Sequence, residues 1–229
     1  MSVAKAKDNK HKRRVFLVDD HPLVREWLTN LINQQADLEV CGEAENASDA
    51  LGGIGRTRPD LAVIDISLNA ASGLELIKDL CIQYPSVALL VLSMHEEELY
   101  AERAMRAGAR GYVRKRATSK NILIAIRRVL EGEICVSEKL SNAMAQKFLK
   151  GHERVGIAQS KVDQLSDREL EVFELLGQGR STSQVAEQLH ISLKTVQAYC
   201  VRAKEKLGLT TAAELLREAI LWQENAHLR

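Results

Sequence analysis

No apolar run in the 229-residue sequence is long enough to cross a membrane, although 45% of its residues are hydrophobic. The basic stretch from Lys5 to Arg14 is followed by a short strand rather than by the apolar core of a signal peptide. Charged residues make up 28% of the chain, and neither half has the composition of a disordered region. We therefore expect a folded cytoplasmic protein with no membrane partner.

Two common motifs are also missing. The four cysteines form no CxxC pair and have no zinc-like spacing with histidine, so we expect reduced thiols, no disulfide and no structural zinc. A dinucleotide-binding fold would place GxGxxG after its first strand, but this chain has DDHPLVRE there. The GGIG run at Gly52 to Gly55 follows a helical pattern and is typical of a helix end.

Four apolar runs are each followed by a polar residue suited to phosphate chemistry. The runs span residues 15–18, 61–64, 87–92 and 111–113, and the residues that follow them are Asp19 with Asp20, Asp65, Ser93 and Lys115. Helical patterns lie between the runs, which favours a parallel sheet. Because ligands bind beyond the carboxyl ends of parallel strands, we expect these side chains to converge.

The alternation of strand and helix predicts a doubly wound α/β domain over residues 12–133, with five parallel strands and five helices. The first helix is expected at residues 22–34, where it would bury Leu23, Trp27, Leu28 and Leu31. A strand at 38–44 and helices after Asn46 and at 72–82, 96–107 and 118–130 complete the pattern.

The residue types at the strand ends suit phosphoryl transfer to a carboxylate. Asp65 would be the nucleophile that accepts a phosphoryl group as an acyl phosphate. Asp19 and Asp20 would hold Mg²⁺, with further oxygens from Asp65 and from the backbone carbonyl of Ser67.

The other two strand-end residues would bind the phosphate itself. Lys115 would neutralise its oxygens, and the Ser93 hydroxyl would hydrogen-bond one of them. No general base is required, because phosphoryl transfer demands mainly positioning and charge stabilisation. A single strand-terminal aspartate is more often a helix cap, and a single lysine is more often a solvated surface residue. The combination in this order favours a phosphoacceptor site.

Four segments carry a family resemblance: FLVDDHPLVRE from Phe16, PDLAVIDISLNAASGLELIKDL from Pro59, LLVLSMHEE from Leu89 and AMRAGARGYVRK from Ala104. They resemble the receiver domain of bacterial two-component response regulators. The resemblance implies a flavodoxin-like fold and phosphorylation of Asp65 by a sensor histidine kinase. It also implies that Tyr112 is a switch residue that turns inward when the hydroxyl residue moves toward the phosphate. A ring packed permanently at the sheet edge is the alternative for Tyr112.

One residue departs from the receiver pattern. In many receivers a proline follows the lysine, whereas Arg116 follows Lys115 here. The sequence therefore gives less reason to expect a cis peptide bond at this point.

The pattern weakens over residues 134–162, which we interpret as a linker. Residues 137–149 predict an amphipathic helix with apolar positions at Leu140, Met144, Ala145 and Phe148. Such a helix packs on its own chain more often than it binds a distinct partner. Residues 151–160 lack a steady period and are typical of a mobile linker.

Residues 163–229 predict an all-α domain of four helices, at about 167–176, 182–188, 193–207 and 212–223. Capping boxes are expected at Ser166, Ser181 and Thr211, and Ser192 is suited to cap the third helix. The short connection before Ser192 is compatible with a helix-turn-helix. The segment from Leu165 to Leu209, LSDRELEVFELLGQGRSTSQVAEQLHISLKTVQAYCVRAKEKLGL, resembles the LuxR-type DNA-binding domain of the NarL/FixJ class of response regulators.

The third helix of this domain would read DNA. Its inward side is expected to carry Val196, Cys200, Ala203 and Leu207, with Tyr199 at the border. The opposite side would face a major groove with Lys194, Gln197, Ala198, Val201, Arg202 and Glu205. Gln197 is suited to adenine, and Ala198 and Val201 are suited to a thymine methyl group. We expect contacts to phosphates or guanine from Lys194, Thr195 and Arg202.

Charge weakens the DNA-binding interpretation. Residues 163–229 contain eight basic and ten acidic residues, a net charge of −2. Tyr199 also replaces a histidine common in the family, and Val201 stands where a base or phosphate contact is frequent. We therefore expect weak nonspecific binding and useful affinity only in a homodimer. The dimer is predicted on the last helix, through Leu215, Leu216, Ala219 and Ile220, with core packing as the alternative.

These observations predict a transcription factor whose receiver, phosphorylated at Asp65, controls promoter binding by a helix-turn-helix domain; it would not be an enzyme in the usual sense. The alternative is a phosphorylation-dependent adaptor whose helical domain binds protein and not DNA. Lys194, Arg202, Lys204 and Lys206 on one helix oppose that alternative. A metal-dependent phosphatase would also use paired aspartates, but it gives no reason for the helix-turn-helix.

Overall fold

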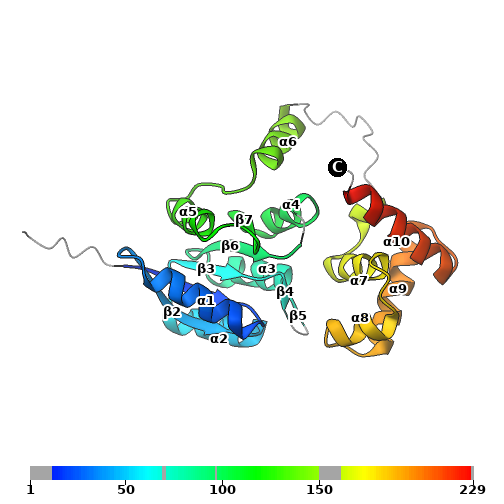
Figure 1. Cartoon of the computed structure of the whole chain (residues 1–229), viewed down its shortest axis with the longest axis horizontal. Helices are drawn as coiled ribbons and strands as arrows, with labels where there is room; N and C mark the ends of the chain where they lie inside the picture. The colour runs from blue at the N-terminus through cyan, green and yellow to red at the C-terminus, as the bar shows by residue number, and fades with distance from the viewer. Residues whose placement is uncertain (1–11, 69–70, 96, 150–160, 228–229) are drawn as a thin grey trace, which may run out of the picture. The chain divides into compact units, whose positions relative to one another are not determined.

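The computed structural model describes residues 12–68, 71–95, 97–149 and 161–227. Contacts divide the chain into two units, Met1–Ala145 and Gln146–Arg229. The first is an α/β unit, and the described residues of the second are helical (Figure 1). No helix in the described part of the chain is long and apolar enough to cross a membrane.

Five parallel strands form the main sheet of the first unit, in the order β2-β1-β3-β6-β7. They are β1 (Arg13–Val18), β2 (Leu38–Ala44), β3 (Leu61–Ile64), β6 (Ala88–Ser93) and β7 (Gly111–Arg114). The strand order reverses at β1 and β3, which is where doubly wound sheets bind their ligands. The predicted flavodoxin-like, five-stranded parallel sheet is confirmed.

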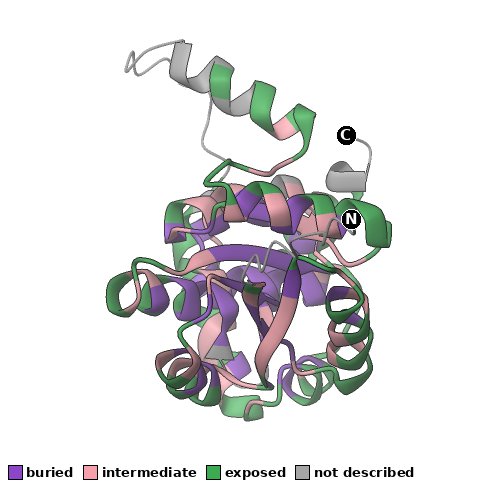
Figure 2. Ribbon diagram, turned by 90° about the vertical axis from the view of Figure 1, so that its left-hand side faces the viewer, coloured by how far each residue is buried: buried purple, intermediate pink, exposed green. Residues whose placement is uncertain are grey.

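Helices cover both faces of this sheet. They are α1 (Pro22–Asn33), α2 (Ala47–Thr57), α3 (Gly73–Gln83), α4 (Glu97–Ala107) and α5 (Ser119–Leu130). One core cluster joins the sheet to α1 and α5, with Leu28 and Ile126 among its buried members. Figure 2 shows the buried strands surrounded by helices whose outer sides are exposed.

The buried face of α1 differs from the prediction. Leu28 is buried, but Leu23 is 80% exposed and Trp27 is 38% exposed. The prediction was wrong for these two residues because the stripe that packs on the core runs through Val24, Leu28 and Ile32. This stripe has the spacing of one helical face, and Leu23 and Trp27 lie one position away from it.

The GGIG run lies inside α2, so the predicted helix end at this run was wrong. A Cβ atom on Gly53 would lie 2.6 Å from the ring of Phe16 in β1. Glycine is therefore needed here for close packing of the helix on the sheet. The helix ends instead at Arg58, which has a left-handed backbone with φ of 47°.

Two short features follow the strands of the sheet. The hairpin of β4 (Ser67–Leu68) and β5 (Ala71–Ser72) comes after β3 and was not predicted. After α5 the chain returns to the edge of β7, where the Cys135 carbonyl accepts a hydrogen bond from the Tyr112 N–H at 2.8 Å.

The linker helix α6 (Glu138–Leu149) starts directly afterwards, as expected. The predicted linker at 151–160, together with the side chains of Met144 and Phe148, lies outside the described residues.

The second unit contains η1 (Lys161–Gln164), α7 (Asp167–Gly177), α8 (Thr182–Gln188), α9 (Leu193–Leu207) and α10 (Ala212–His227). The predicted capping boxes are present at Ser166, Ser181 and Thr211, and Ser192 caps α9. The four predicted helices are confirmed. Helix α10 continues past the predicted end at residue 223, because no glycine or proline follows there.

Candidate functional site

The carboxyl end of the sheet brings two carboxylates and a lysine together. Asp65 follows β3 directly, is 3% exposed, and donates its backbone N–H to the Val18 carbonyl at 2.8 Å. The Lys115 Nζ atom lies 2.7 Å from Oδ2 of Asp65 and 2.7 Å from Oδ2 of Asp19. Residues separated by 50 positions in the sequence are therefore in direct contact, as the strand-end pattern predicted.

Burial and charge oppose each other in this cluster. Burial raises the pKa of Asp65, while the neighbouring Lys115 ammonium acts to lower it. Burial alone would lower the pKa of Lys115, but the carboxylates of Asp65 and Asp19 outweigh it and raise that pKa. Lys115 therefore stays protonated at neutral pH and can bind an anion.

Two carboxylate oxygens at this edge fit a metal ion. Oδ1 of Asp65 and Oδ1 of Asp20 are buried and have no hydrogen-bond partner in the described residues. A buried carboxylate oxygen without a partner is costly, and a divalent cation would satisfy both. Asp19, Asp20, His21 and Asp65 each offer a donor atom, and these atoms lie within 4.8 Å of one another. The donor set consists mainly of carboxylates, which suits Mg²⁺.

His21 was missed by the sequence analysis, although it directly follows the aspartate pair. Its Nδ1 atom lies 3.2 Å from Oδ1 of Asp19 and 2.7 Å from Oδ1 of Asp20. Although Nδ1 of His21 lies close to it, Oδ1 of Asp20 has no hydrogen-bond partner in the described residues. The backbone N–H of His21 donates to Oδ1 of Asp19 at 2.9 Å and helps to fix that carboxylate.

His95 connects the remaining predicted residues and was also missed. Its backbone N–H donates to Oγ of Ser93 at 3.2 Å, and its carbonyl accepts from the Tyr112 hydroxyl at 3.0 Å. Its Nε2 atom lies 2.7 Å from Oγ of Ser67, and its ring is 4.3 Å from that of Tyr100. Ser93 and Tyr112, which are 0% and 3% exposed, are thus joined through one loop residue.

Gly73, at the start of α3, allows the chain to pass close to the phosphoacceptor candidate. A Cβ atom there would lie 2.2 Å from the backbone carbonyl oxygen of Asp65. Gly73→Ala should therefore displace the backbone at Asp65, lower the free energy of unfolding by about 1–3 kcal/mol, and reduce phosphorylation strongly. Urea denaturation and labelling by a small phosphodonor measure the two effects.

Gly52→Ala provides the control, because its Cβ would meet only the flexible end of Arg56 at 3.3 Å. That variant should be at least as stable as the wild type, since alanine favours the helix interior. If Gly73→Ala matched Gly52→Ala in stability and labelling, the close approach at Asp65 would be unimportant.

The two faces of α9 match the prediction. Val196, Ala203 and Leu207 are buried at 0%, 0% and 2% exposure, and Cys200 is partly buried. On the other side Lys194, Gln197, Val201, Arg202 and Glu205 are exposed, while Ala198 is partly covered. The exposed set combines basic, amide and apolar groups, which are the types that contact phosphates and base edges.

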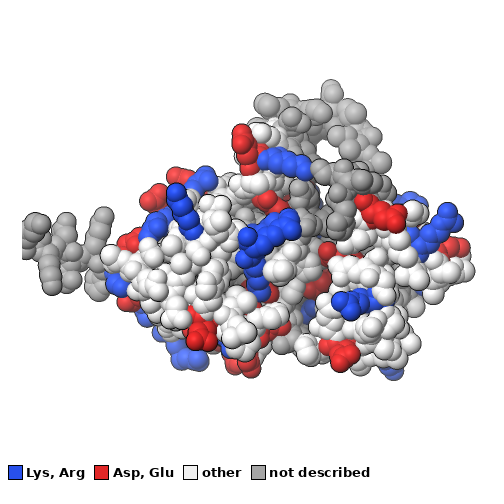
Figure 3. Space-filling model, in the orientation of Figure 1, with Lys and Arg blue, Asp and Glu red and all other residues white. Residues whose placement is uncertain are grey.

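Several side chains of α9 are occupied in ways that the sequence did not predict. Oγ1 of Thr195 lies 2.8 Å from Oγ of Ser192, so this hydroxyl belongs to the helix cap. Lys206 donates to Oε2 of Glu169 in α7 at 2.6 Å, and therefore it does not strengthen the DNA-facing side. The Arg202 guanidinium lies 5.0 Å from the centre of the Tyr199 ring, a cation–π distance. On the face drawn in Figure 3, basic and acidic side chains are interspersed.

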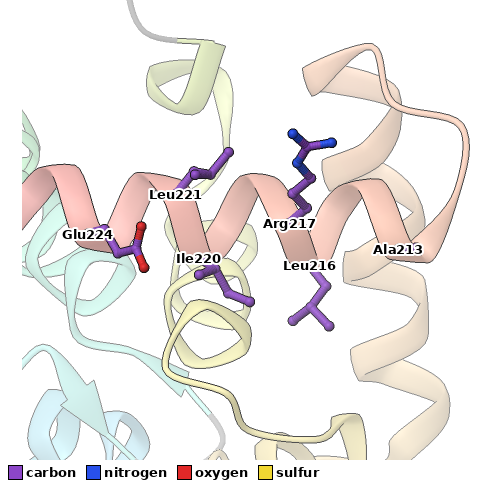
Figure 4. A pocket seen from close by; sticks show the side chains of 6 residues that line it. All are labelled: Ala213, Leu216, Arg217, Ile220, Leu221 and Glu224. Atoms are coloured by element: carbon purple, nitrogen blue, oxygen red, sulfur yellow. The ribbon is translucent and has the colours of Figure 1, made fainter.

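Helix α10 carries an apolar stripe at helical spacing. Leu215 and Ala219 pack inward at 2% and 0% exposure, whereas Leu216 and Ile220 are 41% and 38% exposed. The exposed side forms a shallow groove of about 330 Å³ (Figure 4), lined by Ala213, Leu216, Arg217, Ile220, Leu221 and Glu224. The predicted stripe thus divides into a core half and a surface half.

Comparison with known proteins identifies both units. A model of the response regulator receiver domain matches residues 15–127, and a model of bacterial regulatory proteins of the luxR family matches residues 163–219. The oxygen regulatory protein NreC of Staphylococcus aureus (strain MRSA252) is 32% identical over 209 residues, which are 90% of this chain and 96% of that protein. The chain belongs to the NarL/FixJ class of response regulators.

Solved structures share the fold of this chain. A two-component response regulator of the LuxR family from Aurantimonas sp. SI85-9A1 is 31% identical, with a TM-score of 0.56, and the match covers 60% of this chain and 99% of that one. RcsB of Salmonella enterica serovar Typhimurium, solved bound to the rprA promoter with the phosphomimetic BeF₃⁻, has a TM-score of 0.58 at 23% identity and shares the fold over 90% of this chain and 97% of its own. The two family models and NreC show a transcription regulator with a receiver and a LuxR-type helix-turn-helix domain, as predicted, and they give no support to the adaptor alternative.

Proposed function

We propose that a sensor histidine kinase phosphorylates Asp65 and that this modification controls binding of promoter DNA by α9. The observation that carries the proposal is the buried Asp65 carboxylate, which Lys115 contacts through Oδ2, while Oδ1 has no hydrogen-bond partner within the described part of the chain. A carboxylate oxygen would attack the phosphorus of the kinase phosphohistidine, forming an acyl phosphate as the P–N bond breaks and the imidazole leaves. Lys115 would neutralise the phosphate, and the Ser93 hydroxyl would hydrogen-bond it.

Asp19, Asp20, Asp65 and the Ser67 carbonyl would hold Mg²⁺. When bound, the ion supplies positive charge that offsets the charge on the transferring phosphoryl group. Lys115 already bridges Asp19 and Asp65 at 2.7 Å each, so it orients the acceptor before any donor arrives. The phosphoryl group would come from a donor that already carries it in an activated form. We propose that the cluster accepts this group and does not catalyse turnover of an external substrate.

Tyr112 would report the modification to the rest of the receiver. If the Ser93 hydroxyl turns to the phosphate, it gives up the hydrogen bond that it accepts from the His95 N–H. His95 also holds the Tyr112 hydroxyl through its carbonyl, so a shift of this loop would move the ring. The ring would then act as the switch, and a permanently packed ring is the alternative.

Peptide mass spectrometry tests the site assignment. After treatment with acetyl phosphate and Mg²⁺, the modified peptide should contain Asp65, and hydroxylamine should remove the modification because acyl phosphates are labile to it. A stable modification on a serine, a histidine or another aspartate would contradict the assignment.

In domain terms, we propose a receiver at residues 12–133, a linker at 134–162 and a DNA-binding domain at 163–229, in a cytoplasmic protein. The DNA contacts would come from Lys194, Thr195, Gln197, Ala198, Val201 and Arg202. Because the domain has a net charge of −2, affinity would depend on two copies binding two half-sites.

The dimer contact would use the exposed half of the α10 stripe. Leu216→Gln and Ile220→Gln should weaken binding to a two-half-site operator without unfolding the domain, since both residues are partly exposed in the single chain. Wild-type affinity for two half-sites should exceed that for one by about 100-fold or more, and the variants should lose most of this gain. Fluorescence anisotropy with the two operators measures it in the phosphorylated chain.

Ile82→Gln is the matched control, because Ile82 is 79% exposed in α3 of the receiver. Equal affinity of the wild type for one and two half-sites would reject the dimer.

A further inference from the structure

The backbone carbonyl of Asp19 lies between a strand and a helix and belongs to neither. Strand β1 ends at Val18, and the first carbonyl that accepts from α1 is that of His21, which bonds the N–H groups of Val24 and Arg25 at 3.1 and 3.2 Å. The Arg25 side chain provides a donor instead: its Nη1 atom donates to the Asp19 carbonyl at 2.6 Å. This contact links the start of α1 to the aspartate pair.

Arg25 is itself held by neighbouring side chains. Its Nε atom lies 3.5 Å from Oε2 of Glu43, at the end of β2, and Oε1 of Glu43 accepts from the Thr29 hydroxyl at 2.6 Å. The side chains of Arg25 and Glu43 are 16% and 37% exposed, so their charge attraction alone adds little stability. The main consequence of the pair is geometric, because it fixes where the guanidinium points.

The other polar groups of Asp19 also have partners. Its N–H donates to the Ala44 carbonyl at 3.1 Å, Oδ1 accepts from the His21 N–H at 2.9 Å, and Oδ2 contacts Lys115 at 2.7 Å. Arg25 provides the partner for the remaining group, the carbonyl of the peptide bond that joins Asp19 to Asp20. A rotation of that peptide would turn the Asp20 carboxylate, whose Oδ1 has no hydrogen-bond partner among the residues that the structure describes.

We propose that Arg25 is a positioning residue for the metal site: it fixes the Asp19–Asp20 peptide and thereby aims Asp20 at the ion. The proposal rests on the proposed magnesium site and adds a residue that touches neither the ion nor the phosphate. Groups behind the ligands of a metal commonly change its affinity by 10- to 100-fold. A role in fold stability alone would change the free energy of unfolding and leave the affinity of the folded protein for Mg²⁺ unchanged.

The test compares Mg²⁺ affinity in full-length variants by titration followed with amide NMR shifts, which also show whether each variant is folded. Arg25→Met keeps the length of the side chain but removes the donor, and its dissociation constant for Mg²⁺ should rise about 10-fold. Arg25→Lys keeps one donor for the Asp19 carbonyl and should stay within about 3-fold of the wild type, since it retains that contact. Glu43→Gln should have a smaller effect than Arg25→Met and should add nothing to it in the double variant.

Arg13→Met is a matched control, because Arg13 also donates to a backbone carbonyl, that of Leu130 at 3.2 Å, and pairs with Asp60 at 3.2 Å. It lies at the opposite end of β1, so the Mg²⁺ affinity should be unchanged. An unchanged affinity in Arg25→Met, or an Arg25→Lys variant as poor as Arg25→Met, would overturn the proposal. If the wild type bound no Mg²⁺, or if Asp20→Asn bound it normally, the proposed metal site itself would fail.

Discussion

Asp65→Asn is expected to abolish labelling of the protein by a small phosphodonor with Mg²⁺. The amide that replaces the carboxylate is not a nucleophile for phosphorus, although Lys115 would still lie beside the substituted side chain. The measurement is phosphate incorporation, followed by mass spectrometry of the intact chain. The variant should remain folded, because asparagine keeps the size of the side chain.

Two further variants separate the acceptor from its neighbours. Asp20→Ala should slow labelling and weaken Mg²⁺ binding, yet the acceptor should still become modified to completion over a longer time. Asp79→Asn, at an exposed position of α3, should label as the wild type does. Full labelling of Asp65→Asn would contradict the assignment of the acceptor.

Lys194→Ala and Arg202→Ala should weaken DNA binding without unfolding the second unit, because both side chains are exposed on the outer face of α9. Each lost phosphate contact should lower the salt slope by about one unit. Loss of a bidentate guanine contact would instead cost about 1–3 kcal/mol and relax sequence preference at one position. Gln197→Ala should change preference more than overall affinity, because a neutral side chain releases no counterion.

Lys206→Ala is the matched control on the same helix. Lys206 is paired with Glu169 of α7 at 2.6 Å, so its loss should lower stability rather than the salt slope. Binding to the mapped operator and to scrambled DNA across several salt concentrations measures all four variants. Equal, salt-insensitive binding by the wild type and every variant would reject DNA recognition by α9.

The topology and the strand-end residues were predictable because both follow from local patterns. Apolar runs mark the strands, and a parallel sheet must bring Asp65 and Lys115 to the same edge. The helices of the second unit were equally predictable from the sequence, because the capping boxes at Ser166 and Ser181 each lie within four consecutive residues.

The features that were missed depend on packing between distant elements. Trp27 fits an apolar helical face, but the stripe of α1 that packs on the core runs through Leu28 and Ile32 and leaves Trp27 38% exposed. Gly53 resembles a helix breaker until Phe16 is placed against it. The contact between Ser67 and His95 joins residues 28 positions apart, one in the short strand β4 and one in the loop after β6, and no periodic pattern predicts either position. Lys206 was counted from the sequence among the basic residues of α9, but the structure pairs it with Glu169 of α7.

Operator binding by the full-length protein, with and without acetyl phosphate, tests most directly whether Asp65 controls α9. Coupling between two such sites typically changes affinity by about 5- to 150-fold. We expect a change in this range for the wild type, and none for Asp65→Asn under the same conditions. An equal response of both proteins to the phosphodonor, or no response of the phosphorylated wild type, would contradict control of DNA binding through Asp65.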